Sequence, residues 1–246
     1  MEIPEPLKHC YARTLRIVTR DGTSSSFIMN HKGQQWLVTA NHVVEDRSGN
    51  EKSFVVLDQN GDHHFGLERL QKISGADVAV FRLWAEDLYF GPPFERYGAH
   101  DVRVTQDLCF LGFPDLGNRR RYGLTNASPA TPFIKKAIVS GQAAHHDITA
   151  WLLDGMSNHG FSGGPVIIQE QESERYRVFG VVSSYVPANV PVCPATVEAA
   201  DPGQVGVAPP SPDDPFFETN SGLMIVFDIL HAVQTIDAWL GSQPPE

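Results

Sequence analysis

An all-β fold with one C-terminal helix is what this sequence predicts, from three observations. Short runs of β-branched and aromatic residues recur along the chain, turn-forming pairs such as Asp21-Gly22 and Lys32-Gly33 separate these runs, and a helical period is confined to the C-terminal end. About a dozen short strands connected in this way imply a β-barrel or a β-sandwich.

The expected strands are, in chain order, residues 15–18, 26–29, 36–39, 54–57, 78–83, 108–111, 136–139, 148–151, 166–168, 178–182 and 223–226. The two turn pairs predict hairpins between the first three strands. The helix is expected near residues 227–240, where the spacing of apolar residues such as Ile229, Val233 and Ile236 roughly follows a 3.6 period, with Gly241 directly after. We expect this helix to dock on the barrel surface.

One segment carries no strand or helix pattern. Residues 187–218 hold eight of the 18 prolines, five acidic residues and no lysine or arginine, a composition that cannot form a packed core. Loops of this length are commonly either functional lids or disordered. We expect a disordered insertion.

Composition limits the function classes. With 246 residues, 41% of them hydrophobic, the chain can bury one large core or two smaller ones. A net charge of −10 argues against nucleic-acid binding, and no apolar run approaches the ~20 residues that span a bilayer. The three cysteines, Cys10, Cys109 and Cys193, are widely spaced and odd in number, so we expect neither a disulfide framework nor a metal site. We expect no cofactor and no membrane partner. The free thiols favour a reducing compartment, and we expect the protein in the cytoplasm.

The residues that carry chemistry start with Ser162. It lies in the run Gly160-Phe161-Ser162-Gly163-Gly164-Pro165, with a β-branched run directly behind it. Glycines let backbone N–H groups approach a reacting carbonyl oxygen, so such a turn can hold an oxyanion. A serine nucleophile also needs a histidine base and a group that orients this histidine.

His42 and Asp77 are the candidates for these two roles. His42 follows the expected strand 36–39, where a barrel would hold its imidazole rigidly, and a general base needs that rigidity. Asp77 opens the buried run Asp77-Val78-Ala79-Val80, where a carboxylate is costly unless it is paired. An alternative for Asp77 is that it only caps the turn after Ser74-Gly75-Ala76.

At these residues the chain resembles a known family, the chymotrypsin-like (trypsin-like) serine peptidases, and especially the bacterial Deg/HtrA type. The segment 39–44 (TANHVV) is similar to the family's histidine motif, 77–80 (DVAV) to its aspartate motif, and 160–165 (GFSGGP) to its serine motif, in the same order. The segments 111–114 (LGFP) and 138–141 (IVSG) resemble elements of the family's second barrel.

The resemblance implies a single peptidase domain over residues 1–246, built from two perpendicular six-stranded β-barrels with a C-terminal α-helix. The first barrel would span about residues 12–105, the second 106–228 with the proline-rich insertion 187–218, and the helix 227–241. It also implies that His42 is the base, Asp77 its orienting group, and the N–H groups of Gly160 and Ser162 the oxyanion hole.

Substrate specificity follows from the resemblance as well. Met156, six residues before the nucleophile, would lie at the base of the primary pocket, with walls from the segments around Ser183, Tyr185 and Gly222. No charge lies at that base, so we expect a serine endopeptidase that prefers an apolar P1 residue in a protein or peptide substrate. Tyr185 replaces a glycine that is frequent in the family and could narrow the channel.

The chain also departs from the family. It has no Ile-Val-Gly-Gly-like start, so we expect no activation by an inserted amino terminus. We also expect a peptidase without a PDZ-like domain. The lead-in Asp154 to His159 is unusual, which leaves open whether the oxyanion hole is preformed. His159 itself is expected to be a loop residue. We expect regulation by a protein partner, limited specificity or latency, and the insertion at 187–218 could act as a lid or a processing loop.

Two other functions compete with this one. Gly160-Phe161-Ser162-Gly163-Gly164 also satisfies the GxSxG pattern of α/β-hydrolases, but such a nucleophile runs from strand into helix with its histidine downstream, where only His231 is available. The second alternative keeps the trypsin-like fold but makes it a catalytically silent protein-binding module.

Overall fold

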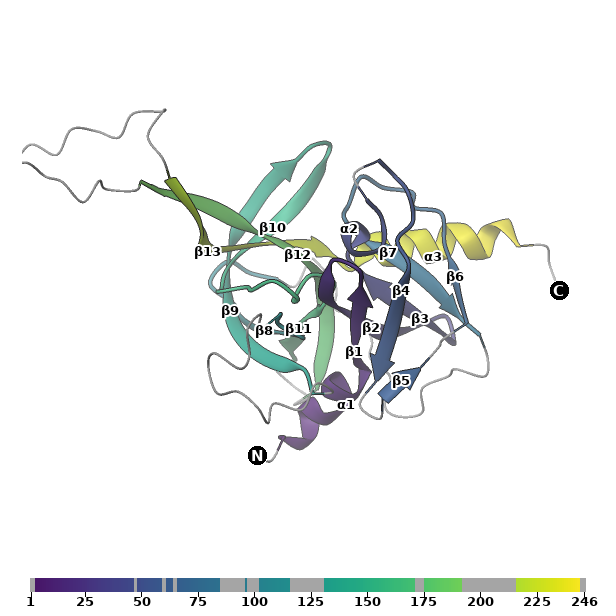
Figure 1. Cartoon of the computed structure of the whole chain (residues 1–246). Coiled ribbons are helices and arrows are strands. Elements are labelled where there is room, and N and C mark those ends of the chain that lie inside the picture. Colours follow the sequence, from purple (N-terminus) through teal and green to yellow (C-terminus); the bar gives the residue numbers. More distant parts are fainter. Residues whose placement is uncertain are drawn as a thin grey trace, which may run out of the picture.

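The computed structural model describes residues 3–46, 48–58, 61–63, 66–84, 96, 102–115, 131–170, 175–191 and 216–243. Two β-structures lie side by side, built from the two halves of the sequence (Figure 1). The strands of the first are β1 Thr14–Thr19, β2 Gly22–His31, β3 Gln34–Thr39, β4 Phe54–Asp58, β5 Gly61–His63, β6 Leu67–Arg69 and β7 Ala79–Leu83. The strands of the second are β8 Asp107–Gly112, β9 Phe133–His145, β10 Ile148–Asp154, β11 Pro165–Gln169, β12 Tyr176–Pro191 and β13 Phe216–Asp228.

The two β-structures differ in closure. The first is a seven-stranded sheet in the order β5-β4-β1-β2-β3-β7-β6, and the second is a closed barrel in the order β10-β13-β12-β11-β8-β9. The pairings between these strands are antiparallel. The prediction of a mostly β chain with a C-terminal helix is therefore confirmed.

Both predicted hairpins are present. Thr19 pairs with Gly22 across a two-residue turn. His31 pairs with Gln34 across Lys32 and Gly33, whose φ angles of 49° and 75° are those of a type I′ turn. These turns fix the register of β1, β2 and β3, and β3 ends at Thr39, three residues before His42.

Three buried clusters hold the fold together. One fills the first β-structure and includes Leu15, Ile28 and Phe81. A second fills the barrel and includes Phe110 and Phe161. The third joins the two structures, because its buried members come from both of them and from the C-terminal helix; they include Phe27, Trp36, Leu111, Val181, Phe227 and Ile236. The two β-structures therefore share an apolar interface.

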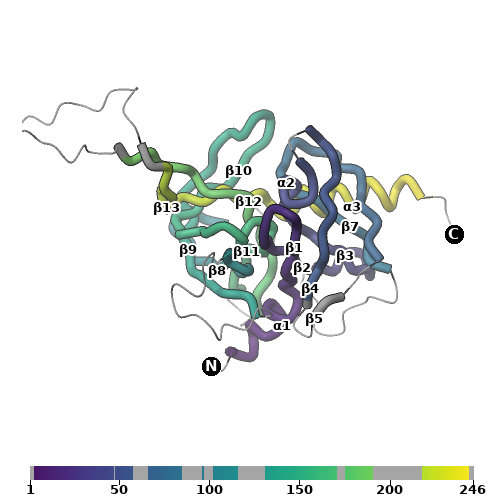
Figure 2. Tube along the Cα trace, viewed as in Figure 1, coloured from purple at the N-terminus to yellow at the C-terminus, as the bar shows by residue number. Residues whose placement is uncertain are grey.

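The C-terminal helix returns the chain to the first β-structure. This helix, α3, covers Leu230–Ser242 and packs against β7. In Figure 2 it is the yellow coil labelled α3, near the label of β7. Asp237 accepts hydrogen bonds from His31 and Lys32 at 2.8 Å each, and Trp239 packs edge-on against Trp36. The helix thus docks on the first β-structure, although β13, the strand that precedes it, belongs to the second.

Several elements were not predicted from the sequence. An N-terminal helix, α1 (Glu5–Arg13), contacts β1, β2 and β12, and one helical turn, α2 (Asn41–Val44), carries His42. The short strands β5 and β6 were also missed. None of the helices in the described ranges is long and apolar enough to span a membrane.

The expectation of a structureless insertion at 187–218 is wrong at both of its ends. β12 continues to Pro191, β13 begins at Phe216, and pairs such as Ala188 with Thr219 and Val190 with Phe217 extend the ladder outward. This two-stranded arm projects away from the barrel (Figure 1). Residues 192–215, including Cys193, lie outside the described residues.

Candidate active site

His42 and Asp77 are brought together by the pairing of β3 with β7. Thr39, three residues before His42, pairs with Ala79, two residues after Asp77. The Asp77 carboxylate accepts a hydrogen bond from the Nδ1 of His42 at 2.6 Å and another from the backbone N–H of His42 at 2.8 Å. Both the ring and the backbone of His42 are therefore fixed by one carboxylate.

Ser183, on β12 of the second barrel, makes a third contact with this carboxylate. Its hydroxyl donates to Asp77 Oδ2 at 2.6 Å, and the Ser183 residue is buried. Burial alone would raise the pKa of Asp77, but the hydrogen bonds from His42 and Ser183 and the attraction of His42 outweigh burial, so the pKa of Asp77 lies below its usual value. Asp77 is thus ionised at neutral pH, which suits a group that stabilises an imidazolium.

Ser162 lies in a tight loop that is pressed against the end of β3. The next residue, Gly163, has φ +85°, and a Cβ there would lie 2.1 Å from both the Ser25 carbonyl oxygen and Thr39 Oγ1, and 2.9 Å from the Ala40 nitrogen. Ala40 is two residues before His42. The loop therefore seats Ser162 beside the segment that carries His42, and only glycine fits at position 163.

The outer ends of the Ser162 and His42 side chains have no hydrogen-bond partner in the described part of the chain. Within the described ranges, the Ser162 hydroxyl makes no hydrogen bond, and the ring of His42 bonds only through Nδ1. The His42 side chain is 51% exposed. In enzymes without bound substrate, the hydrogen bond between a nucleophile and its base is often long, and it shortens when substrate binds.

The carbonyl groups of the loop around Ser162 are all hydrogen-bonded within the protein. Every carbonyl oxygen from residue 155 to residue 162 accepts a hydrogen bond from the protein, and the donors, in chain order, are Ser157 N, Lys135 Nζ, Asn220 Nδ2, Phe161 N, Asp115 N, Ser25 Oγ, Gly164 N and Ser25 N. A carbonyl that pointed into an oxyanion hole would block it. Here each of these oxygens is bound elsewhere.

The N–H groups of Gly160 and Ser162 remain as donors. The His159 carbonyl accepts from Asp115 N at 2.7 Å, and since the C=O and N–H of a trans peptide point in opposite directions, the N–H of Gly160 points away from Asp115. Gly160 has φ +96°, and a Cβ there would lie 2.2 Å from the Phe113 carbonyl oxygen. Neither N–H has an acceptor within the described part of the chain, so both are available to an oxyanion.

The residues predicted to form the primary pocket are placed as neighbours. The Gly155 N–H donates to the Gly222 carbonyl at 2.8 Å, which puts the predicted pocket base at Met156 next to one predicted wall. Met156 is 54% exposed. On the other side, the ring of Tyr185 meets the ring of His159 edge-on, with centroids 5.7 Å apart. His159 is an exposed loop residue.

Two residues near the site were missed from the sequence. Lys135, on β9, donates to the Met156 carbonyl at 2.7 Å and to Asn158 Oδ1, and its ammonium lies 5.1 Å from the Phe161 ring centroid. Burial lowers the pKa of Lys135. Ser25 binds the loop from the first β-structure. A hint of Ser25 is its place in Ser24-Ser25-Ser26, a polar run at the start of the expected strand 26–29. No local signal marks Lys135.

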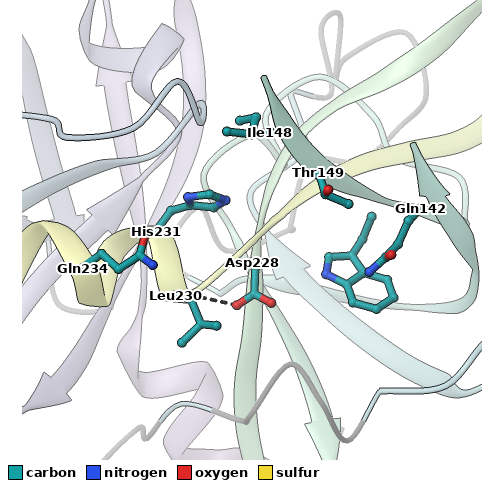
Figure 3. Close-up of a pocket in the computed structure, with 8 residues that line it drawn as sticks. Gln142, Ile148, Thr149, Asp228, Leu230, His231 and Gln234 are labelled. Atoms are coloured by element: carbon teal, nitrogen blue, oxygen red, sulfur yellow. Dashed lines mark hydrogen bonds between the residues drawn. The ribbon is translucent and has the colours of Figure 1, made fainter. Parts of the chain in front are cut away.

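A hollow of about 340 Å³ lies elsewhere, between the hairpin of β9 and β10 and the start of α3 (Figure 3). At its edge, Asp228 Oδ1 accepts a hydrogen bond from the backbone N–H of Leu230 at 2.8 Å. Its lining is Gln142, Ile148, Thr149, Trp151, Asp228, Leu230, His231 and Gln234. None of the predicted site residues lines this hollow, and His231, the histidine that an α/β-hydrolase would require, lies here.

The described residues contain no cluster suited to a metal ion, and the thiol of Cys10 is not activated. No group of three or more His, Cys, Asp or Glu side chains within the described ranges is arranged to hold a metal ion. Cys10 is buried, and burial raises the pKa of its thiol to about 12, so it is not a thiolate at neutral pH.

The chain after Ser162 does not fit an α/β-hydrolase. Three residues after Ser162, at Pro165, the strand β11 begins, whereas an α/β-hydrolase requires a helix there.

Comparisons with known structures agree with this architecture. The chain superimposes on the Rv3671c protease of M. tuberculosis H37Rv, in a serine-to-alanine mutant of the inactive form, with a TM-score of 0.57 at 14% identity, over 98% of this chain and 93% of that one. Rv3671c protease in the inactive form gives 0.56 at 15% identity, over 95% and 92% of the two chains. A serine-to-alanine variant of the HtrA-type protease AlgW, with tripeptide, gives 0.58 at 15% identity, over 96% of this chain and 63% of that chain.

At these identities the likeness to solved structures concerns the fold, which is the predicted chymotrypsin-like double barrel. None of the curated proteins matches the sequence. Residues 24–174, which include His42, Asp77 and Ser162, match the family of trypsin-like peptidase domains. The chain belongs to this trypsin-like peptidase family, and it is a serine endopeptidase.

Proposed function

We propose that the protein hydrolyses peptide bonds with Ser162 as nucleophile, His42 as general base and Asp77 as the group that orients His42. The observation that carries this proposal is the pair of hydrogen bonds that the ring Nδ1 and the backbone N–H of His42 donate to the Asp77 carboxylate. A carboxylate that binds Nδ1 leaves Nε2 as the basic nitrogen, which is the tautomer that a serine needs.

The reaction would proceed in two halves. In the first, Nε2 of His42 takes the proton of the Ser162 hydroxyl while Oγ bonds to the substrate carbonyl carbon, and His42 then returns the proton to the leaving amine as the C–N bond breaks. In the second, His42 takes a proton from water while the water oxygen bonds to the acyl carbon, and His42 then returns the proton to Ser162 Oγ as the acyl C–O bond breaks and the carboxylic acid leaves. Asp77 stays ionised throughout, which its low pKa supports.

The N–H groups of Gly160 and Ser162 would bind the oxyanion in both halves. The hydrogen-bonded carbonyl groups of residues 155–162 support a hole that is formed before substrate binds. Fixed donors of this kind need no reorganisation during the reaction, and each is typically worth about 10²–10³ in rate.

An apolar P1 residue fits the proposed pocket. Met156 at its base carries no charge, and the nearby ammonium of Lys135 is engaged by a carbonyl, an amide oxygen and an aromatic face. A cationic P1 side chain would find no carboxylate at that base. Protein or peptide substrates with Leu, Met or Phe at P1 are therefore expected to be cleaved faster than those with Arg or Lys.

Regulation is the remaining part of the proposal. A peptidase of broad specificity in the cytoplasm would endanger its own cell. We therefore propose that narrow specificity or a protein partner limits the activity of this peptidase. The free thiols of Cys10 and Cys109 support a reducing compartment. Subcellular fractionation tests the compartment, and recovery of the protein only from an exported fraction would contradict this placement.

Cleavage of a proteome-derived peptide library tests the peptidase proposal. Wild-type protein, Ser162→Ala and His42→Ala are incubated with the library, and new termini are identified by mass spectrometry. We expect cleavage after apolar residues by the wild type and no such termini with either variant. Cleavage mainly after Arg or Lys would contradict the pocket assignment, and identical termini from all three proteins would contradict the assigned nucleophile and base.

A further inference from the structure

Ser25 connects the first β-structure with the nucleophile loop of the second. It lies on β2 and is fully buried. The pairing of β2 with β3 stops one residue away, at Ser26 with Thr39. Ser25 therefore has no β3 residue opposite it. The loop takes this place, because the Ser25 N–H donates to the Ser162 carbonyl at 2.9 Å.

The hydroxyl of Ser25 makes two further bonds whose directions are fixed. It lies 2.9 Å from the backbone nitrogen of Phe113 and 2.6 Å from the Gly160 carbonyl oxygen. The Phe113 N–H can only donate, so the Ser25 oxygen accepts there and its own proton goes to Gly160. A hydroxyl that accepts and donates at once is polarised, which strengthens both bonds.

The same short segment holds the next peptide of the loop. Asp115, two residues after Phe113, donates its N–H to the His159 carbonyl at 2.7 Å. The carbonyls on both sides of the Gly160 N–H are therefore held by Ser25 and by the 113–115 segment to which Ser25 is bonded. Ser25 thus holds the peptide between Gly160 and Phe161 and the peptide after Ser162. The N–H groups of the proposed hole belong to the peptides 159–160 and 161–162, and the 160–161 peptide that Ser25 holds lies directly between these two.

Loss of the Ser25 hydroxyl would release this arrangement. Gly160 is buried, so its carbonyl would be left without a partner, at a cost of about 1–3 kcal/mol. Glycine has no Cβ to resist a change of backbone angles, so rotation of the loop peptides to find a new partner is the easy relief. Because the N–H groups of Gly160 and Ser162 lie in the two peptides on either side of the 160–161 peptide, such a rotation would displace them from the oxyanion.

We propose that Ser25 is a positioning residue that keeps the oxyanion hole formed from the opposite half of the molecule. This inference rests on the proposed function, because it concerns the hole of the same site. If Ser25 has this role, the ability of the hole to bind an oxyanion depends on both β-structures, because a shift of one against the other would strain the hydrogen bonds of Ser25 to Gly160 and Ser162.

The kinetic test compares Ser25→Ala with Ser26→Ala. Ser26 is the matched control, because it is equally buried on the same strand but its hydroxyl bonds to the Leu15 carbonyl at 3.4 Å, within the first β-structure. Rates are expressed per site labelled to completion by a fluorophosphonate, so that misfolded protein does not count. Affinity for a peptide aldehyde, which forms a hemiacetal oxyanion with the nucleophile, is measured beside kcat and KM.

For Ser25→Ala we expect kcat to fall about 10- to 100-fold, KM to change less than about threefold, and aldehyde affinity to fall in parallel with kcat/KM. For Ser26→Ala we expect wild-type kinetics per labelled site. An unchanged kcat in Ser25→Ala, or an equal loss in both variants, would overturn the proposal.

A second readout does not depend on catalysis. Because His159-Gly160 is the only His-Gly pair in the sequence, ¹³C-carbonyl histidine with ¹⁵N-glycine selects the Gly160 amide by NMR. We expect its resonance to move or split in Ser25→Ala and to match the wild type in Ser26→Ala; a single wild-type resonance in both variants would contradict the role of Ser25. If the wild type proved inactive while the resonance still moved, the proposed function would fail and the positioning role would stand.

Discussion

The carboxylate of Asp77 holds His42 at two points, the ring Nδ1 at 2.6 Å and the backbone N–H at 2.8 Å, and so fixes where the imidazole lies and which nitrogen carries the proton. The Ser183 hydroxyl, from the other half of the molecule, donates to the same carboxylate at 2.6 Å. The pair at the centre of the site is thus held from both β-structures.

Replacing Asp77 with asparagine should preserve the shape but not the chemistry. The amide has lost the negative charge, and its NH₂ group can present a donor to Nδ1, which favours the wrong tautomer of His42. We expect Asp77→Asn to lower kcat by about 10⁴ with a small change in KM. Steady-state kinetics on an apolar P1 substrate check this, and a loss below tenfold would show that Asp77 does not orient the base.

The same carboxylate makes a pH-dependent contribution to stability. The pKa of Asp77 is lower in the folded protein than its unfolded value of about 3.9, so its contribution is fully present above about pH 4–5 and is lost as pH falls through the folded pKa. The difference in unfolding free energy between the wild type and Asp77→Asn should therefore be constant near neutral pH and shrink in acid. A difference that grows as the pH falls would mean that the pKa of Asp77 is raised.

Gly163 is expected to be essential for seating the loop. Alanine there would place its Cβ 2.1 Å from Ser25 O and from Thr39 Oγ1, whereas alanine at Gly33, which also has positive φ, would meet no atom within 4 Å. We expect Gly33→Ala to cost about 1–2 kcal/mol of stability, the backbone penalty alone, and Gly163→Ala to cost more and to abolish activity. Chemical denaturation measures both, and equal costs would contradict the close contact.

Lys135 should affect substrate binding more than the chemical step. Its ammonium holds the Met156 carbonyl and Asn158 Oδ1, so Lys135→Met, which keeps the length of the side chain, should loosen the pocket base and raise KM for peptides about three- to tenfold. Lys136→Met is the control, because Lys136 is the exposed neighbour on the same strand. Equal KM values for the two variants would exclude this role of Lys135.

The strands with strong local patterns could be predicted from the sequence. β-branched runs bounded by turn residues marked β1, β2, β3 and β7, and the motifs around His42, Asp77 and Ser162 marked the candidate site. β5 and β6 were missed because three-residue strands carry too few positions for a pattern. α1 begins at a glutamate followed by proline, and its buried residues Cys10, Tyr11 and Arg13 show that contacts with the rest of the fold stabilise it.

The supporting contacts of the site could not be predicted in the same way. Ser25, Lys135 and Ser183 act on the loop and on Asp77 across separations that no local pattern encodes. The strand ends at residues 187–191 and 216–218 lie in a segment that is rich in proline, which hid them from the sequence pattern. They form because the backbone ladder of β12 and β13 continues outward from the barrel. In each case tertiary contact decided the structure.

Covalent labelling of Ser162 tests the central claim most directly. Wild-type protein, Ser162→Ala and Asp77→Asn are treated with a fluorophosphonate, and the modified peptide is identified by mass spectrometry. We predict one adduct per wild-type chain, located on Ser162, slower labelling of Asp77→Asn, and no adduct on that peptide in Ser162→Ala. A folded wild type that stays unlabelled, or an adduct confined to another residue, would contradict the assignment of Ser162, and a silent binding module would then be the better account.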